Sequence, residues 1–192
     1  HFFDTPFTKY FLRGQNGYVV LCNAVKEDLL RIKPGALCKE IPHPIYAQFG
    51  EKLSKESACN LIGANPNLKT LLFFGLIREY KGLDILLRAF NTLGSNYQLV
   101  IAGEPYGSFD KYAKLIEESP NRERIILNTN YIKDSEVNRY FSAADLCVLP
   151  YRSATQSGIS NISFFYNLPL LTTNVGGLKE MIADKGLGVV VN

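Results

Sequence analysis

The sequence of 192 residues lacks several features that mark common protein classes. No apolar run approaches the roughly 20 residues that a membrane-spanning helix needs. There is no dense run of lysine and arginine with interleaved aromatic residues, and a net charge of +3 is too small to indicate a nucleic-acid-binding protein. We therefore expect neither a membrane span nor a nucleic-acid partner.

Cysteine and histidine are scarce, with four and two residues respectively. The cysteines are widely scattered and form no CxxC pair, and no group of His, Cys and carboxylate residues has metal-ligand spacing. Cys22 and Cys147 lie in apolar runs, which is typical of small buried hydrophobic residues. The sequence thus predicts a reduced, cytoplasmic setting and no metal or other cofactor.

Three common motifs of ligand binding and catalysis are also absent. No GxGxxG follows the strand that begins at residue 71, which argues against a dinucleotide site. No GxxxxGK[ST] indicates a P-loop, and no GxSxG indicates a nucleophile elbow.

The most informative stretch of the sequence is residues 70–93. An apolar run at 71–74 predicts a buried strand that turns at Gly75, and leucine and phenylalanine at helical spacing then predict an amphipathic helix. Arg78 and Lys81 lie between them. Cations beside a helix N-terminus suit a phosphate, because unpaired N–H groups and the helix dipole favour an anion there. The alternative is that both are ordinary solvated loop charges.

Strands and helices alternate from residue 70 to the end. The strands are continuous apolar runs, which is the pattern of a parallel sheet covered by helices on both faces. We therefore expect an α/β fold with a doubly wound parallel sheet, which binds ligands at the carboxyl ends of its strands, at a topological switch point. Further strands are expected at 97–102, 125–127, 146–149, 170–173 and 189–191, and further helices at 109–118, from a cap at Asp134, at 158–166 and at 178–182.

The pattern before residue 40 is shorter. Aromatic residues at helical spacing within residues 1–12 predict a short helix that covers a core. A strand is expected at 18–22. Asn23 is the expected N-cap of a helix that stops before Pro34.

Residues 41–45 read Ile-Pro-His-Pro-Ile and cannot form a helix, because each proline biases its predecessor to an extended conformation. This segment is the expected linker or hinge. It divides the chain into residues 1–45 and 46–192. His43, between the two prolines, is interpreted as structural or solvent-facing rather than catalytic. A short helix is expected at 55–62.

The loop after the strand at 146–149 is rich in hydroxyl, amide and small residues and leads into a helix. Its backbone amides at 157–159 could cradle a phosphate. Two cations and one helix N-terminus that face each other would hold a diphosphate. The alternative is an ordinary connection with an N-cap.

Five segments in order carry a resemblance to a known family. They are FFGLIREYKGLDILLRAF, IAGE, YFSAADLCVLPY, SATQSGI and TTNVGGLKEMI. Together they resemble the C-terminal domain of retaining glycosyltransferases of the group 1 type (family GT4, GT-B fold) over residues 68–192. The earlier segments VVLCNAVKEDLL and IPHPIY look like the last strand and helix of the N-terminal GT-B domain and the hinge.

The resemblance implies that residues 46–192 are a Rossmann-like, donor-binding domain truncated at its C-terminus. Lys81 matches the lysine of the family's KG pair and, with Arg78, would neutralise the donor diphosphate in catalysis. Arg78 is a looser match, because the family's arginine directly follows the glycine, where this chain has Leu76. The donor-binding residues implied are Gly75, Glu104, Tyr131, Ile132, Gln156, Ser157, Gly158 and Asn161.

The implied reaction is transfer of a sugar from a nucleotide-sugar donor, with retention, to a carbohydrate or lipid-linked acceptor in polysaccharide or cell-surface glycan synthesis. The diphosphate is the leaving group, and no metal is required. Similar enzymes work at the inner face of the membrane, so peripheral membrane association is consistent with the resemblance.

One departure concerns a glutamate pair that many members carry. The corresponding positions fall near Ala154 and on Ile162, and neither is acidic. The expected substitutes are Gln156, Ser157 or Asn161 through hydrogen bonding, or else donor binding is altered or lost. Glu180 is expected to be structural and to bond loop backbone.

The chain also looks like a fragment. An N-terminal GT-B domain takes well over a hundred residues, whereas only about 45 residues precede the expected hinge here. This piece alone is expected not to transfer sugar. Two alternatives stay open. One is a degenerate GT-B domain that serves as a binding or interaction module. The other is a non-hydrolysing epimerase, which would need additional His and carboxylate residues in the cleft, whereas His1 and His43 are the only histidines of this sequence.

Overall fold

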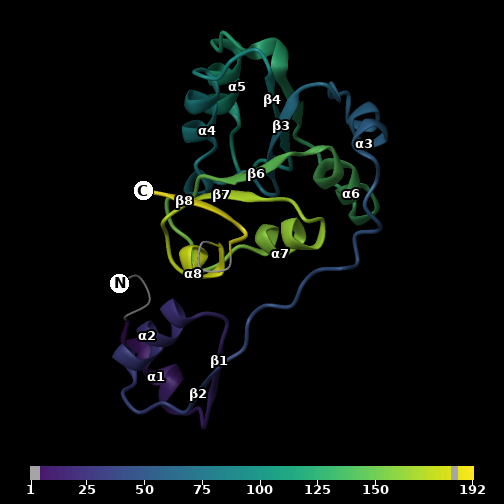
Figure 1. The fold of residues 1–192 in the computed structure, drawn as a ribbon. Coiled ribbons are helices and arrows are strands. Elements are labelled where there is room, and N and C mark those ends of the chain that lie inside the picture. The colour runs from purple at the N-terminus through teal and green to yellow at the C-terminus, as the bar shows by residue number, and fades with distance from the viewer. Residues whose placement is uncertain (1–4, 183–185) are drawn as a thin grey trace.

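The computed structural model describes residues 5–182 and 186–192 (Figure 1). It contains a two-stranded sheet near the N-terminus and a six-stranded sheet in the rest of the chain. An extended segment without helix or strand, residues 41–54, runs between them (Figure 1). Among the described residues, every helix is too short or too polar for a membrane crossing.

We call the first part the N-terminal unit. It consists of α1 (Pro6–Arg13), β1 (Tyr18–Val20), α2 (Asn23–Ile32) and β2 (Cys38–Glu40).

The second part is the six-stranded unit. Its helices are α3 (Lys55–Ile62), α4 (Leu83–Phe90), α5 (Asp110–Glu117), α6 (Asp134–Ala143), α7 (Gly158–Phe165) and α8 (Leu178–Ile182), with the 3-10 helices η1 (Glu79–Lys81) and η2 (Arg122–Arg124). Its strands are β3 (Lys69–Phe74), β4 (Tyr97–Ala102), β5 (Ile125–Asn128), β6 (Leu146–Leu149), β7 (Leu170–Thr173) and β8 (Gly188–Val191).

The six strands are ordered β5-β4-β3-β6-β7-β8, and every neighbouring pair is parallel. The chain winds outward from β3 in one direction through β4 and β5, and in the other through β6, β7 and β8. The order therefore reverses between β3 and β6, which makes this pair the topological switch point.

The two faces of the sheet are both covered, and β3 shows how. Leu71 and Phe73 pack with α4 and α5 in one core cluster. Leu72 and Phe74, which point to the opposite face, pack with α6, α7 and α8 in another. The continuous apolar run of β3 thus serves two cores at once. The predicted α/β fold with a doubly wound parallel sheet is confirmed.

The N-terminal unit differs from the prediction in three respects. Helix α1 has no buried residue, and Phe7 and Tyr10 are 78% and 77% exposed, so the expectation that this helix covers a core is wrong. The predicted helix begins in residues 1–4, which lie outside the described residues. Strand β2 was not predicted; it pairs in parallel with β1. Asn23 is the first residue of α2 rather than its N-cap, which is Cys22.

The six-stranded unit has one similar shift. Asp134 is the first residue of α6, and the N-cap is Lys133. The remaining predicted strands and helices of this unit lie within two residues of their expected bounds. The division of the chain into domains at residue 45 stays a prediction.

Candidate functional site

The candidate site lies at the switch point between β3 and β6. The loop after β3, residues 75–81, and the loop after β6, residues 150–157, leave the same edge of the sheet. The backbone N–H of Arg152 donates to the carbonyl of Tyr80 at 2.7 Å. The rings of Tyr80 and Tyr151 meet edge to face with centroids 6.0 Å apart. The cationic loop and the hydroxyl-rich loop therefore form one surface, as the doubly wound topology predicts.

Lys81 is the buried cation of this surface, with only 8% of the residue exposed. Its Nζ lies 5.9 Å from the centre of the Tyr151 ring, and a Cβ at Gly75 would stand 3.3 Å from it. Across the described residues, the side chain has neither a hydrogen bond nor an ion pair. Burial, helped by the charge of Arg78 and opposed by Cys147, lowers the pKa of Lys81 to about 8. A buried ammonium without a counterion is a group that an anionic ligand would stabilise.

Arg78 occupies a different position from Lys81. Its guanidinium carbon lies 4.5 Å from the centre of the Tyr106 ring, in the loop that follows β4. Its Nε is buried and has no hydrogen-bond partner in the described part of the chain. Arg78 is close enough to lower the pKa of Lys81, but it does not line the cavity beside Gly75.

Helix α7 presents its amino end to the same turn. A Cβ at Gly75 would be 3.2 Å from the Cδ1 of Ile159. The N–H groups of residues 157–159 have no acceptor among the described residues. The Ser157 hydroxyl does not cap the helix but pairs with the Tyr151 hydroxyl at 3.0 Å. Unpaired amides at a helix start favour an anion, so a second anion-binding element adjoins the β3 turn.

A cavity of about 380 Å³ opens beside Gly75. Most of its lining is apolar, and the carboxylate residues Glu104 and Asp134 also border it. Four of the residues implied by the resemblance lie here together. They are Gly75, Glu104, Tyr131 and Ile132.

Among the further lining residues that were not predicted as part of the site are Phe49, Phe74 and Ile162. Phe74 is the last residue of β3, and this position at the carboxyl end of the strand could have predicted that it borders the site. Phe49 comes from the extended segment before α3, and nothing in the local sequence indicates that it reaches the sheet. Ile162 stands where the resembled family has its second glutamate, and here it contributes an apolar wall.

Gln156 and Asn161 do not line this cavity. They border a separate cavity of about 410 Å³ between the two units, with His43 and Glu180. The Gln156 Nε2 donates to the carbonyl of Leu21 at 2.5 Å. The expectation that Glu180 bonds loop backbone is not met, since no such hydrogen bond occurs within the described ranges. His43 is half-buried, and its Nε2 lies 2.9 Å from the Tyr46 hydroxyl.

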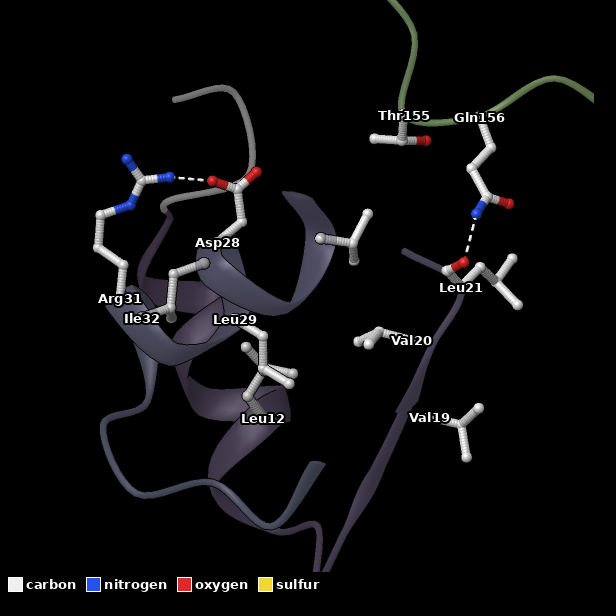
Figure 2. Close-up of a pocket in the computed structure, with 11 residues that line it drawn as sticks. Leu12, Val19, Val20, Leu21, Asp28, Leu29, Arg31, Ile32, Thr155 and Gln156 are labelled. Carbon is white, nitrogen blue, oxygen red and sulfur yellow. Dashed lines mark hydrogen bonds and ion pairs between the residues drawn. The ribbon is translucent and has the colours of Figure 1, made fainter. Parts of the chain in front are cut away.

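Another cavity, of about 470 Å³, lies away from these cations. Figure 2 shows it bordered by β1 and α2, with Thr155 and Gln156 approaching from the loop after β6. Its lining is mostly aliphatic, and its charged residues, Asp28 and Arg31, pair with each other. Among the described residues that line it, no charge is unpaired, so the site at the switch point is the better candidate for an anionic ligand. Across the described ranges, no three His, Cys, Asp or Glu side chains gather as metal ligands would.

Comparison with known proteins gives the family. The profile of the family described as "Glycosyl transferases group 1" matches residues 68–192. The chain is 30% identical to the D-inositol 3-phosphate glycosyltransferase of Mycolicibacterium smegmatis, over 72% of this chain and 32% of that protein. It is 26% identical to an uncharacterized 41.2 kDa protein in the cps region of Klebsiella pneumoniae, over 74% of this chain and 38% of that protein.

Solved structures agree in fold. Sucrose-phosphate synthase from Thermosynechococcus elongatus superposes with a TM-score of 0.82 at 19% identity, over 95% of this chain and 47% of that one. Anabaena HepE in complex with UDP-glucose gives 0.79 at 16% identity, over 99% and 56%. The chain thus spans about a third of these curated relatives and about half of these solved chains. With its parallel sheet covered on both faces and the family match over most of its length, this chain belongs to the group 1 glycosyltransferases and has their GT-B type of α/β fold.

Proposed function

We propose that this chain binds the nucleotide-sugar donor of a retaining glycosyltransferase of the GT4 type at the carboxyl ends of β3 and β6. One observation carries the proposal. Lys81 is buried without a counterion, and it adjoins Gly75 together with the unpaired amides at the start of α7. Positive charge from both sides suits a diphosphate. The apolar cavity of about 380 Å³ next to Gly75 suits the planar base.

The same groups would serve the chemistry. As the sugar leaves, negative charge develops on the diphosphate, and donors that are already in place stabilise it without reorganisation. Lys81 acts most strongly, because its surroundings exclude water. The amides at 157–159 add partial positive charge, and Arg78 adds its charge from beside Tyr106.

The relatives support this proposal without identifying the substrates of this chain. HepE was solved with UDP-glucose, and other relatives are named as D-inositol 3-phosphate glycosyltransferases. Because the chain spans only about a third of its curated relatives, we assign donor binding to this chain and sugar transfer to a longer protein. The acceptor we propose is a carbohydrate or lipid-linked glycan. The proposed setting is polysaccharide synthesis in the cytoplasm, with peripheral association at the inner face of the membrane.

A second candidate is a degenerate donor domain that binds without transfer. It is favoured by the glutamate positions of the resembled family, which hold Ala154 and the cavity-lining Ile162. The polar residues expected to substitute, Gln156 and Asn161, line the other cavity. On this reading the sugar lacks its carboxylate contact, although the diphosphate site is intact.

The test is calorimetric titration of this chain with UDP, GDP and their sugar conjugates. We expect one nucleotide to bind saturably, and Lys81→Ala to weaken it tenfold or more, which is about 1.4 kcal/mol. Lys69→Ala is the matched control, because Lys69 is exposed at the opposite end of β3. It should leave the affinity unchanged.

Absence of binding by the folded chain would contradict the proposal. Binding of the nucleotide with no gain in affinity from any attached sugar would favour the degenerate binding domain.

A further inference from the structure

We propose that Arg152 is a positioning residue that holds Lys81 in place for the diphosphate, acting through the backbone of the turn before α4. The inference rests on the proposed function. It adds a residue that the motifs do not single out, and one that touches no part of the expected ligand.

Arg152 forms hydrogen bonds with residues on both sides of Lys81 in the turn. Its backbone N–H and its Nη1 donate to the carbonyls of Tyr80 and Glu79, each at 2.7 Å. Its Nη2 donates to the Oδ2 of Asp84, also at 2.7 Å. The first two partners directly precede Lys81 in the chain, and the third follows it by three residues. One side chain therefore bridges the residues on either side of the lysine.

The carboxylate of Asp84 balances the charge of Arg152. Asp84 is 5% exposed and lies in the first turn of α4, where the helix dipole favours an anion. The hydrogen bond from Arg152 lowers the pKa of Asp84, against the opposing effect of burial. Lys111 lies further away, with its Nζ 3.9 Å from the same oxygen. Because Arg152 is paired with a carboxylate, its effect on a ligand passes through the turn.

The turn needs this support because it has few bonds of its own. Helix η1 has only three residues, and it is closed by the bonds from the Lys81 N–H to the Arg78 carbonyl and from the Gly82 N–H to the Glu79 carbonyl. Such short 3-10 turns have poorer hydrogen-bond geometry than an α-helix. A shift of about 1 Å in a positioned group is enough to weaken its action strongly.

The same loop also fixes the second anion-binding element. Tyr151, the neighbour of Arg152, places its ring 5.9 Å from the Lys81 Nζ. Its hydroxyl pairs with Ser157, directly before α7. Arg152 therefore sets the position of the lysine relative to the amides of α7, which is the spacing that a diphosphate has to match.

The test compares nucleoside diphosphates with nucleosides. UDP, GDP, uridine and guanosine are titrated into the folded wild type, Arg152→Ala and Arg152→Lys. The matched control is Arg88→Ala, an exposed arginine on α4 without a hydrogen bond or ion pair to the described residues. We expect Arg152→Ala to weaken the diphosphate about tenfold, and the nucleoside less than about twofold. Arg152→Lys should fall between, and the control should change neither.

A double-mutant cycle shows whether the effect passes through the lysine. In the Lys81→Ala background, Arg152→Ala should weaken the diphosphate by less than about twofold. An equal loss in both backgrounds, or an equal loss for the nucleoside and its diphosphate, would show that Arg152 only supports the fold and would overturn the inference.

A second readout does not need a nucleotide. The pH dependence of acetylation of Lys81, followed by mass spectrometry, reports when its amine loses its proton. Releasing the turn by Arg152→Ala should hydrate the amine and move the midpoint upward from about 8 toward the ordinary 10.5. An unchanged midpoint overturns the inference even if the nucleotide binds as proposed. If the midpoint of Lys81 acetylation shifts but no nucleotide binds, the proposed function is contradicted and the inference about Arg152 stands.

Discussion

The two units of this chain bury their apolar residues to different extents. In the six-stranded unit, β3 buries residues on both faces between two layers of helices. In the N-terminal unit, α1 has no buried residue, and a cavity of about 470 Å³ lies along β1 and α2 (Figure 2). A two-stranded sheet with two short helices has too little surface to close a core of its own. This contrast indicates that stability is concentrated in the unit that carries the candidate site.

Among the described residues, side-chain hydrogen bonds join the two units at two points, and Cys22 also packs against Gly177. The amide of Gln156 donates to the carbonyl of Leu21, and the thiol of Cys22 approaches the carbonyl of Thr155 at 3.7 Å. Neither is worth more than about 1 kcal/mol. Changes in one unit should therefore leave the other largely unaffected.

The largest loss is expected at Gly82, in the six-stranded unit. Its φ is +69°, and a Cβ there would overlap the carbonyl oxygen of Pro150. Gly82→Ala should lower the free energy of unfolding by about 4 kcal/mol, because both backbone strain and a steric clash with rigid backbone result. Gly107→Ala is the control, since its φ is +94° but nothing lies near. It should cost about 1 kcal/mol. Urea unfolding measures both, and equal costs would contradict the clash.

Truncation of one leucine in each unit compares how much buried apolar packing stabilises the two units. Leu87 is fully buried between α4 and the sheet, whereas Leu29 borders the open cavity of the N-terminal unit. Leu87→Ala should cost about 3 kcal/mol in urea unfolding of the six-stranded unit. Leu29→Ala should cost less, about 2 kcal/mol, and leave that transition in place, because Leu29 is buried but borders a cavity. A comparable loss from Leu29→Ala would show that the two units unfold as one.

Lys81 is a point where the packed unit gives up stability. Burial lowers its pKa from 10.5 to about 8. Between pH 8 and pH 10.5 the unfolded chain therefore holds the proton more tightly than the folded chain, and the free energy of unfolding rises with pH. Lys81→Met should therefore stabilise the unit by about 2 kcal/mol at pH 7. The gain should shrink as the pH rises from 8 toward 10.5. Thermal unfolding at several pH values tests this, and a gain that does not vary with pH would contradict it.

The smallest effect is expected in α1. Phe7→Ser should change the free energy of unfolding by less than about 0.5 kcal/mol, because the side chain is already 78% exposed. Phe90→Ser, in the core of the six-stranded unit, is the contrasting variant. A large loss from Phe7→Ser would mean that α1 packs against something in solution.

The sequence predicted the six-stranded unit well for a local reason. Buried strands and amphipathic helices each have their own pattern, and β4, β6 and α3 have the predicted bounds. The sequence does not predict strand β2, because the strand has only three residues, Cys-Lys-Glu, and only one of them is apolar. The aromatic residues of α1 fall at the spacing of a buried face, but spacing does not say whether another element lies against it.

The site divides in the same way. Gly75, Glu104, Tyr131 and Ile132 were predicted from the loops that follow strands and from the family resemblance, and they do share one cavity. The roles assigned to these residues stay predictions. Gln156 and Asn161 were expected to replace the missing glutamate pair by hydrogen bonding, but they line the other cavity, beside the N-terminal unit. Residues close in a helix point in different directions, so neighbourhood along the chain did not decide which cavity they line.

From the sequence alone one can predict where most strands and helices form, and that the loops after the strands gather at one edge of the sheet. Those features follow from apolar periodicity and from the topology of a parallel sheet. Three features are visible only in the folded chain: Lys81 is buried without a counterion among the described residues, Ile159 lies against Gly75, and Arg152 bridges the turn. These depend on how segments distant in sequence approach within a few ångströms, which no local pattern encodes.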